Sequence, residues 1–269
     1  MCETVVRKAD ICAGLRAIGV LEGDICLFHS SFKSFGSVEG GAETVIAAFE
    51  SVLGPEGTLV VPTLCSKDFE NSYQTWHMDK PSDCGYLTEY FRKQANVLRS
   101  DHATHSVAAR GKEAYSLTFE HGARGPHMTP FGEYAFSDSS PWAKMYERNA
   151  KIVFVGVTMM YNTMKHFVER RYVEWVLSQI PDEEKCRQMT AMVKRFDFAE
   201  GVWPYYNSER MQTRLEEAGL LRSTKCGNAT LLCVEAKPSS DFALTLLQTE
   251  PDNWVRNQTR DWLRMCLGI

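Results

Sequence analysis

Apolar and polar positions follow two different periods along the first part of the chain. Residues 8–19 place apolar side chains at helical spacing. Four consecutive apolar residues at 25–28 then predict a short buried strand, which stops at the polar sequence that begins with His29. Helical spacing returns over 41–53, and 58–62 (TLVVP) predicts a second strand. A strand, a helix and a strand in this order indicate a βαβ unit with a parallel, buried sheet.

The remainder of the chain predicts a third strand, more helices and two long loops. Residues 151–157 (KIVFVGV) form the third apolar strand, and a long helix follows over 163–179. Residues 66–84 lack a regular period and residues 122–141 are rich in Gly, Ser and Pro, so both predict loops. Loops of this length are often functional or disordered. The other predicted elements are a helix at 85–95, a strand followed by a helix within 106–119, a helix at 208–218 and a strand at 229–236.

The predicted fold is a single α/β domain over residues 1–269. Because strands alternate with helices along the chain, we expect a mixed, largely parallel central sheet flanked by helices. No internal repeat and no linker rich in Pro or Ser divides the sequence. A chain of this length can bury a sizeable core as one unit.

Composition and charge narrow the class of protein. Charged residues make up 24% and hydrophobic ones 44%, as in ordinary globular proteins. The 30 Lys and Arg against 34 Asp and Glu give a net charge of −4, which argues against nucleic acid or an anionic membrane as partner. We see no signal segment and no apolar run of membrane-spanning length. The nine cysteines include no CxxC pair, so we expect a cytoplasmic protein without disulfides or structural metal.

The first polar segment that can do chemistry runs from His29 to Gly36. It lies at the carboxyl end of a predicted strand, where open α/β sheets bind their ligands. Its hydroxyls, its backbone N–H groups and Lys33 suit an anion, but a polar loop with helix caps explains the same residues equally well. The GxxxxGK[ST] spacing of a P-loop is absent.

Two further segments carry histidines. Within 99–106, His102 and His105 are three residues apart and can share a helix face as metal ligands. No third ligand is obvious nearby, and structural roles account for both equally well. After the third predicted strand, His166 and Glu169 lie on one helix face. A carboxylate beside an imidazole fixes its tautomer and supports its positive charge, which suits a general base. A surface ion pair is the more common reason for this spacing, but the location at the carboxyl end of a strand favours a functional role.

Four blocks of the chain occur together in a recognisable order and spacing. They are HSSFKSFGSVEGGAETVIAAFESVLGPEGTLVVPTL (29–64), RSDHATHSVAARG (99–111), SSPWAKM (139–145) and KIVFVGVTMMYNTMKHFVE (151–169). With a weaker block, GNATLLCVEA (227–236), they resemble the aminoglycoside 3-N-acetyltransferase family. The resemblance implies the antibiotic N-acetyltransferase fold of that family, unrelated to the GNAT acetyltransferases. It also implies an enzyme that transfers an acetyl group from acetyl-CoA to an amine.

The resemblance assigns roles to residues of this chain. The family's catalytic TxxHxxE stretch is matched here, with His166 and Glu169 as the catalytic residues, and no metal is implied. The segment after the first strand is expected to hold the pantetheine and phosphates of coenzyme A. The residues expected at the coenzyme A site are His29, Ser30, Ser31, Lys33, Ser34, Phe35, Gly36, Ser106 and Thr163.

The expected acceptor is a small-molecule amine, in this family the 3-amino group on the deoxystreptamine ring of an aminoglycoside. Such drugs are polycations, so carboxylates outside the strands should bind them. The candidates are Asp68, Glu70, Asp79 and Asp138. Three features depart from the family: SDSSP at 137–141 replaces GxGSP, Arg170-Arg171 lies beside the expected pocket, and 66–84 and 181–210 show no usable match. In addition, Ala103 replaces the usual proline.

These residues predict direct transfer in a ternary complex. His166 would accept the proton of the amine, Glu169 would orient the ring, and donors near Ser31 or Ser106 would stabilise the oxyanion. Two alternatives stay open: an acyl-CoA N-acyltransferase for an amino sugar or another biosynthetic amine, and a non-catalytic coenzyme A-binding relative. The sequence also leaves open the regiochemistry, the length of the acyl group, a homodimer, and the roles of His102 and His105.

Overall fold

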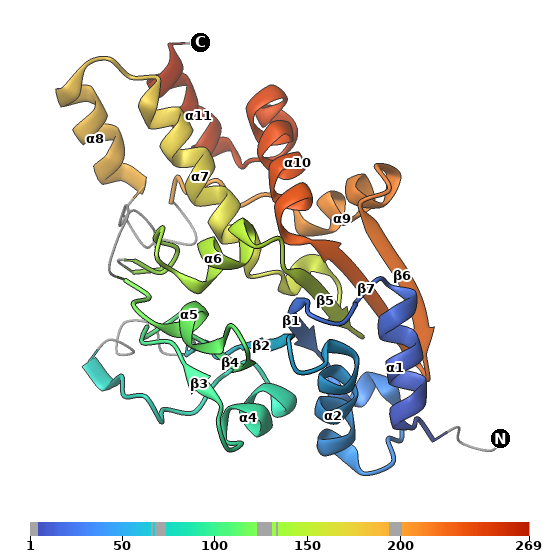
Figure 1. The fold of residues 1–269 in the computed structure, drawn as a ribbon. Coiled ribbons are helices and arrows are strands. Elements are labelled where there is room, and N and C mark those ends of the chain that lie inside the picture. Colours follow the sequence, from blue (N-terminus) through green and yellow to red (C-terminus); the bar gives the residue numbers. More distant parts are fainter. Residues whose placement is uncertain are drawn as a thin grey trace.

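The computed structural model describes residues 5–65, 67, 74–122, 131–132, 134–193 and 201–268. Seven strands form one sheet in the order β3-β4-β2-β1-β5-β7-β6, with helices on both of its faces (Figure 1). The strands are β1 (Ile25–Ser30), β2 (Thr58–Pro62), β3 (Leu98–Arg99), β4 (Val107–Gly111), β5 (Lys151–Val155), β6 (Leu221–Cys226) and β7 (Ala229–Glu235).

The helices surround this sheet and carry the chain between its strands. The α-helices are α1 (Lys8–Ala17), α2 (Gly41–Leu53), α4 (Tyr86–Arg92), α5 (Ala114–Thr118), α6 (Pro141–Glu147), α7 (Met164–Ser178), α8 (Glu183–Val193), α9 (Ser208–Glu217), α10 (Ala236–Thr249) and α11 (Asn257–Leu267). Three short 3₁₀ helices are η1 (Phe32–Phe35), η2 (Met159–Tyr161) and η3 (Pro251–Asn253).

The three central strands form the parallel part of the sheet. β1 pairs with β2, with Ile25 opposite Thr58, and with β5, with Cys26 opposite Lys151. α2 connects β1 to β2, so the βαβ unit predicted from the apolar pattern is confirmed. The helix ends at Gly54, whose φ of 65° is a conformation that favours glycine.

The prediction that the sheet is largely parallel is wrong. Four of the six pairings between described strands are antiparallel: β2–β4, β3–β4, β5–β7 and β6–β7. Only Gly227 and Asn228 separate β6 from β7, and so short a turn returns the chain antiparallel. Residues 100–106 between β3 and β4 are also too few for a parallel crossover, which needs a dozen or more residues.

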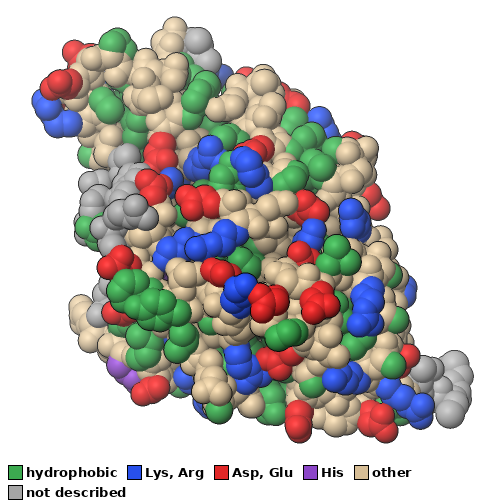
Figure 2. Space-filling model, viewed as in Figure 1, with side chains coloured by type: hydrophobic (Ala, Val, Ile, Leu, Met, Phe, Trp, Pro, Cys, Tyr) green, Lys and Arg blue, Asp and Glu red, His purple; other side chains and the backbone are tan. Residues whose placement is uncertain are grey.

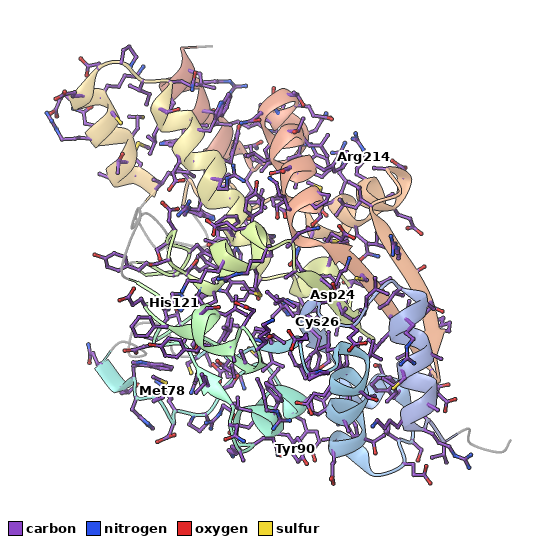
Figure 3. The ribbon with its side chains drawn as sticks, viewed as in Figure 1. Asp24, Cys26, Met78, Tyr90, His121 and Arg214 are labelled. Atoms are coloured by element: carbon purple, nitrogen blue, oxygen red, sulfur yellow. The ribbon has the colours of Figure 1, made fainter. Side chains whose placement is uncertain are left out.

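Successive residues of β1 enter two separate apolar clusters, one on each face of the sheet. Cys26 and Phe28 pack with α1 and α2, and the Phe28 ring stacks on Phe49 with centroids 4.5 Å apart. Ile25 and Leu27 pack on the other face, under α6, α7 and α10. This alternation follows from the two-residue period of a strand. Figure 3 labels Cys26, which lies on β1 in the sheet.

The second half of the chain contains helices that the periodicity did not reveal. α8 buries only Met189 and Val193, so its apolar stripe is too narrow to stand out in the sequence. α10 begins directly at the end of β7 and has Pro238 in its first turn, where a missing N–H is tolerated. The helix predicted at 208–218 and the strand predicted at 229–236 are confirmed by α9 and β7.

The described surface carries charges of both signs. Figure 2 shows acidic and basic side chains interspersed over one face of the molecule. Among the described helices, none combines the length and the apolar character that a membrane span requires.

Candidate active site

The carboxyl ends of the three parallel strands deliver polar residues to one edge of the sheet. β1 ends with His29 and Ser30, and β5 leads through η2 into α7, which carries His166. The prediction that a loop begins at His29 is wrong: His29 and Ser30 continue the parallel pairing, opposite Phe154 and Val155. The predicted location of the site at this edge agrees with how parallel sheets place their ligands.

A cavity of about 260 Å³ opens at this edge. Its lining includes His29, Ser30 and Thr163, which are three of the residues predicted to hold coenzyme A. The remaining lining residues are Pro62, Leu64, Asp83, Cys84, Thr88 and Tyr161. Sequence reasoning assigned none of these six to the site. Asp83, Cys84 and Thr88 lie outside the recognised blocks, and Pro62, Leu64 and Tyr161 lie within them but carry no chemistry that singles them out. The cavity therefore joins three predicted residues to a wall that only the fold reveals.

His29 is a buried, neutral side chain in the wall of this cavity. It is 5% exposed, and its ring stacks on Phe154 with centroids 5.3 Å apart. Burial without a charged partner lowers the pKa of His29 to about 3. Its buried Nε2 atom has no hydrogen-bond partner among the described residues. An unused polar atom is costly in an apolar setting, so the wall offers a bonding position to an uncharged polar group.

Ser31 and Ser34 shape the turn that follows β1. Ser31 is the N-cap residue of η1, and its carbonyl accepts a hydrogen bond of 2.6 Å from the Ser34 hydroxyl. Ser34 lies directly against Gly156, where an added Cβ would be 1.7 Å from Ser34 Oγ. Gly156 also has a φ of 62°, so both space and conformation require glycine there. The two serines thus stay close to the end of β5.

The other residues predicted to bind coenzyme A differ in how far they are buried. Lys33 is exposed, whereas the Phe35 side chain is fully buried in the apolar cluster below α2. Gly36 ends η1 with a φ of 82°. Ser106 is buried, and its hydroxyl is bonded to Thr63. Phe35 and Ser106 therefore have structural partners of their own.

His166 and Glu169 form a hydrogen-bonded pair on the first turns of α7. His166 Nδ1 lies 2.6 Å from Glu169 Oε2. The Glu169 side chain is completely buried, whereas the His166 side chain is 19% exposed. Because the carboxylate holds the proton on Nδ1, Nε2 is the basic nitrogen of the ring. The pair predicted from spacing is therefore a buried dyad with one accessible side, not a surface ion pair.

Besides His166, three groups among the described residues hold the buried carboxylate of Glu169. Trp203 donates its indole N–H to Oε2 at 2.8 Å, and the backbone N–H of Tyr206 donates to Oε1 at 3.4 Å. Lys165 Nζ is 3.7 Å from Oε1. A buried charge needs such partners to remain ionised at low cost. Sequence reasoning missed Trp203, since it lies 34 residues beyond Glu169 in a stretch with no motif.

Aromatic rings enclose His166. The Phe131 ring centroid is 4.3 Å from that of His166, and those of Phe136 and Tyr205 are 5.8 and 6.0 Å away. Burial and the charge of Glu169 raise the pKa of Tyr205, so its phenol stays protonated. Rings packed in this way limit the access of water to a reaction beside His166.

His105 faces His166 edge-on, with centroids 6.1 Å apart. Thr104 donates its hydroxyl proton to the carbonyl of Phe131 at 2.7 Å, so Thr104 Oγ1 accepts the Nδ1–H of His105 at 2.9 Å. Burial and the neighbouring His166 lower the pKa of His105 well below its usual value. His105 is therefore neutral, and of the two rings His166 is the one that contacts a carboxylate.

His102 serves the local turn. Its Nδ1 atom accepts backbone N–H groups from Thr104 at 3.2 Å and His105 at 3.0 Å. Among the residues that the structure describes, no three His, Cys, Asp or Glu side chains are grouped to hold a metal ion.

The predicted acceptor carboxylates have different surroundings. Asp79 is exposed, and Asp68 and Glu70 lie outside the described residues. Asp138 is 57% exposed and pairs with the buried guanidinium of Arg170 at 2.9 Å. Arg170 also donates to the carbonyl of Phe136 at 2.8 Å, so it holds the Asp138 segment beside the His166 ring. The arginine that is unusual for the family thus has a structural partner.

The sequence of this chain is similar to those of known proteins. A family model described as aminoglycoside 3-N-acetyltransferase matches residues 27–248. Aminoglycoside N(3)-acetyltransferase VII of Streptomyces paromomycinus is 25% identical over 90% of this chain and 92% of its own. The aminoglycoside N(3')-acetyltransferase-like protein YokD of Bacillus subtilis is also 25% identical, over 88% of this chain and 90% of its own.

Solved structures share the fold. AAC-IIIb in a binary complex with CoASH has a TM-score of 0.71 at 21% identity and covers 91% of this chain and 97% of its own. AAC-VIa bound to sisomicin has a TM-score of 0.69 at 20% identity, with coverage of 91% and 98%. These likenesses establish the arrangement of the strands and helices.

Proposed function

The chain belongs to the aminoglycoside 3-N-acetyltransferase family, and from that membership we propose that it transfers an acetyl group from acetyl-CoA to an amine of an aminoglycoside, on the 3-amino group of the deoxystreptamine ring. The observation that carries the proposal is the His166–Glu169 dyad, which is buried on its carboxylate side and accessible on its imidazole side. Its residues are the two that the family resemblance assigns to catalysis.

His166 and Glu169 divide the work of proton transfer. The amine forms a C–N bond to the thioester carbonyl, and His166 Nε2 takes the proton that the nitrogen loses. The C–S bond then breaks, and the same proton leaves His166 with the thiolate as free thiol. Glu169 keeps Nδ1 protonated and stabilises the imidazolium between these two steps. A thioester is already activated, so the chain needs no covalent intermediate.

The cavity beside β1 fits the thioester arm of coenzyme A. Ser30 and Thr163 supply hydroxyls, and the unused Nε2 of His29 supplies a further bonding position for an amide or a carbonyl. His29 is neutral at ordinary pH because of its low pKa, which suits the uncharged pantetheine better than a phosphate. Lys33, exposed on the adjoining turn, suits the phosphates.

The residues around His166, where the acceptor amine would bind, support a second candidate function. The described residues around His166 are mainly aromatic, and Asp138 is already paired with Arg170. A polycationic drug would have to compete with that guanidinium for the carboxylate. An amino sugar or another amine with fewer positive charges would not, and this pair therefore favours such an acceptor as the alternative to an aminoglycoside.

A thiol-release assay with a panel of amines tests the proposal. The purified protein is mixed with acetyl-CoA and one acceptor at a time, including gentamicin, apramycin, sisomicin and the monoamine glucosamine. We expect thiol release with an aminoglycoside and a product that carries one acetyl group by mass spectrometry. Release with glucosamine alone would favour the second candidate. Acetyl-CoA binding without release for any amine would contradict both and favour a non-catalytic relative.

A further inference from the structure

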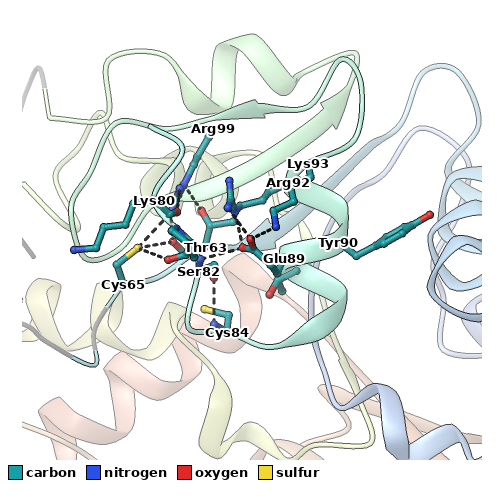
Figure 4. Close-up of polar contacts among 12 residues, drawn as sticks. Thr63, Cys65, Lys80, Ser82, Cys84, Glu89, Tyr90, Arg92, Lys93 and Arg99 are labelled. Atoms are coloured by element: carbon teal, nitrogen blue, oxygen red, sulfur yellow. Dashed lines mark hydrogen bonds and ion pairs between the residues drawn. The ribbon is translucent and has the colours of Figure 1, made fainter. Parts of the chain in front are cut away.

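Arg99, the last residue of β3, makes an unusually complete set of hydrogen bonds at the sheet edge next to the cavity (Figure 4). Its Nε–H is shared between Thr63 Oγ1 and Ser106 Oγ, each at 3.2 Å. One Nη2 hydrogen reaches the carbonyl of Thr63 at 2.8 Å, and the other reaches Cys65 Sγ at 3.4 Å. These contacts tie β3 to the residues that directly follow β2.

The remaining hydrogens of Arg99 reach a different chain segment. Nη1 donates to the carbonyls of Met78 at 2.8 Å and Lys80 at 2.5 Å. The guanidinium also lies over the ring of Trp76, 4.6 Å from its centroid, and Trp76 in turn donates to Asp101 at 2.6 Å. Arg99 thus joins residues 76–80 to the end of β2.

The bonding pattern requires an arginine and leaves nothing for a ligand. A guanidinium has five N–H groups in a fixed plane, and the acceptors at Thr63, Met78, Lys80 and Cys65 engage all of them. A lysine ammonium has three donors and cannot span acceptors on both segments at once. Arg99 therefore acts through the chain segments that it holds, and not by direct contact with a substrate.

The segment held by Arg99 continues into the wall of the cavity. Asp83 donates its backbone N–H to the carbonyl of Leu64 at 2.7 Å, and Leu64 donates to Cys84 Sγ at 3.2 Å. All three residues line the cavity. Because they lie within a few residues of Lys80 or Thr63, the position of this wall depends on the junction that Arg99 makes.

A second anchor holds the far side of the same segment. Glu89 on α4 accepts the backbone N–H of Ser82 at 3.0 Å. Burial alone would raise the pKa of Glu89, but hydrogen bonds from Arg92 and Lys93 outweigh it and lower that pKa to about 2. The carboxylate is therefore charged at every working pH, and Figure 4 shows Ser82 beside Glu89, with Arg99 above them.

We propose that Arg99 is the positioning residue of the acyl-donor pocket: it holds residues 78–84 against the end of β2 so that Asp83 and Cys84 wall the cavity. This inference rests on the proposed function, in which the cavity receives acetyl-CoA. It assigns Arg99 an effect on donor affinity and not on the proton transfer at His166.

Arg99→Lys tests the role, and Arg110→Lys is its matched control. Arg110 lies on the adjacent strand β4, pairs with Glu50 and stacks on Phe91 at 5.2 Å, so it has a similar environment away from the cavity. In Arg99→Lys we expect the KM for acetyl-CoA to rise about tenfold or more while kcat changes less than about threefold. Arg110→Lys should keep both constants. Loss of folded protein alone would lower the active fraction and leave KM unchanged.

Alkylation of Cys84 by iodoacetamide, mapped by mass spectrometry without any substrate, gives a second readout. Burial raises the pKa of Cys84 to about 11, so the thiol reacts slowly while the wall is held. We expect faster labelling in Arg99→Lys relative to Cys186 on α8 as internal reference. Should that variant fold poorly, Trp76→Leu removes the ring beside the guanidinium together with its hydrogen bond to Asp101, keeps every hydrogen bond of Arg99, and should move both readouts the same way by less.

The outcomes separate this inference from the function on which it rests. A parent protein that neither binds acetyl-CoA nor releases thiol contradicts the proposed function and the inference together. A parent that does both, with an unchanged KM and unchanged Cys84 labelling in Arg99→Lys, overturns the inference alone. A fall in kcat per folded molecule without a change in KM would also overturn it.

Discussion

Four of the described histidines occupy two opposite environments. His29, His105 and His121 are almost completely buried, and none of the described carboxylates contacts their rings. Burial lowers the pKa of all three, that of His29 to about 3. His166 instead has one nitrogen on a buried carboxylate and a partly exposed ring. The second environment supports a positive charge, whereas the first opposes it.

This difference shows why residue type alone does not identify a base. His121 has a full set of neutral partners, with Nδ1 3.0 Å from Ser100 Oγ and Nε2 3.0 Å from the carbonyl of Ala135. Its ring stacks on His102 with centroids 4.7 Å apart. Such a ring is locked as a neutral structural group. Among the described histidines, His166 is the one beside which a carboxylate, aromatic rings and partial exposure occur together.

Replacing His166 should cause the largest loss of activity among the changes predicted for these residues. His166→Ala should lower kcat and kcat/KM together by about 10²–10⁴-fold, the usual contribution of a positioned base. Acetyl-CoA affinity by calorimetry should stay near that of the parent, because the cavity residues are untouched. If the variant keeps more than about a tenth of the activity, the base is elsewhere, and His105 is then the next residue to replace.

Removing the charge from Glu169 should have a smaller effect. Glu169→Gln keeps an oxygen for Trp203 but loses the charge that stabilises the imidazolium, so we expect kcat to fall about 10- to 100-fold. Glu184→Gln on α8 is the matched control, since Glu184 is an exposed helix carboxylate paired with Arg187. Equal activity of the two variants in the thiol-release assay would show that Glu169 has no catalytic role.

Trp203→Phe tests how much the hydrogen bond to Glu169 contributes to activity. It removes the 2.8 Å hydrogen bond to Glu169 but keeps most of the buried ring, and we expect kcat to fall about three- to tenfold. Trp262→Phe is the control, because buried Trp262 donates to the carbonyl of Met189 at 3.1 Å on a different helix. The control should lower the melting temperature and keep kcat. A parallel loss of kcat in both variants would mean that stability alone is being measured.

The neutral state of buried His29 can be tested through the pH dependence of the free energy of unfolding. Above about pH 6.5 neither the folded nor the unfolded state protonates His29. Below that value the unfolded chain takes up the proton while the folded state, with a pKa of about 3, does not. The free energy of unfolding therefore falls with falling pH, by about 1.4 kcal/mol per pH unit for this one group.

His29→Gln removes that proton uptake and should flatten the pH dependence between about pH 6 and pH 4. Urea denaturation at a series of pH values measures it. His77→Gln serves as control, since His77 is exposed, and its slope should match that of the parent. A slope for His29→Gln equal to that of the parent would contradict a neutral, buried His29.

The centre of the fold and the contact between His166 and Glu169 could be predicted because their signals are local. The runs 25–28 and 58–62 are continuous apolar strands around an amphipathic helix, and such a pattern fixes a parallel βαβ unit. His166 and Glu169 are three residues apart on one helix, so their contact follows from helix geometry. The antiparallel edge strands were missed since β3 has only two residues and β6 is mostly polar.

The rest of the site depends on contacts between distant parts of the sequence. Trp203 reaches Glu169 across 34 residues, Arg170 reaches Asp138 across 32, and Arg99 reaches Thr63 across 36. No period or motif in the chain records these distances. Each becomes visible only when the sheet places the segments side by side, which is why the sequence predicted the contact between His166 and Glu169 but not the groups that position it.

The central claim is that Glu169 acts through His166, and a double-mutant cycle tests it most directly. The kcat values of the parent, His166→Ala, Glu169→Gln and the double variant are measured at saturating acetyl-CoA and acceptor. If the two residues form one unit, Glu169→Gln should change kcat less than about twofold once His166 is already alanine. A full, independent loss from Glu169→Gln in the alanine background would contradict the dyad.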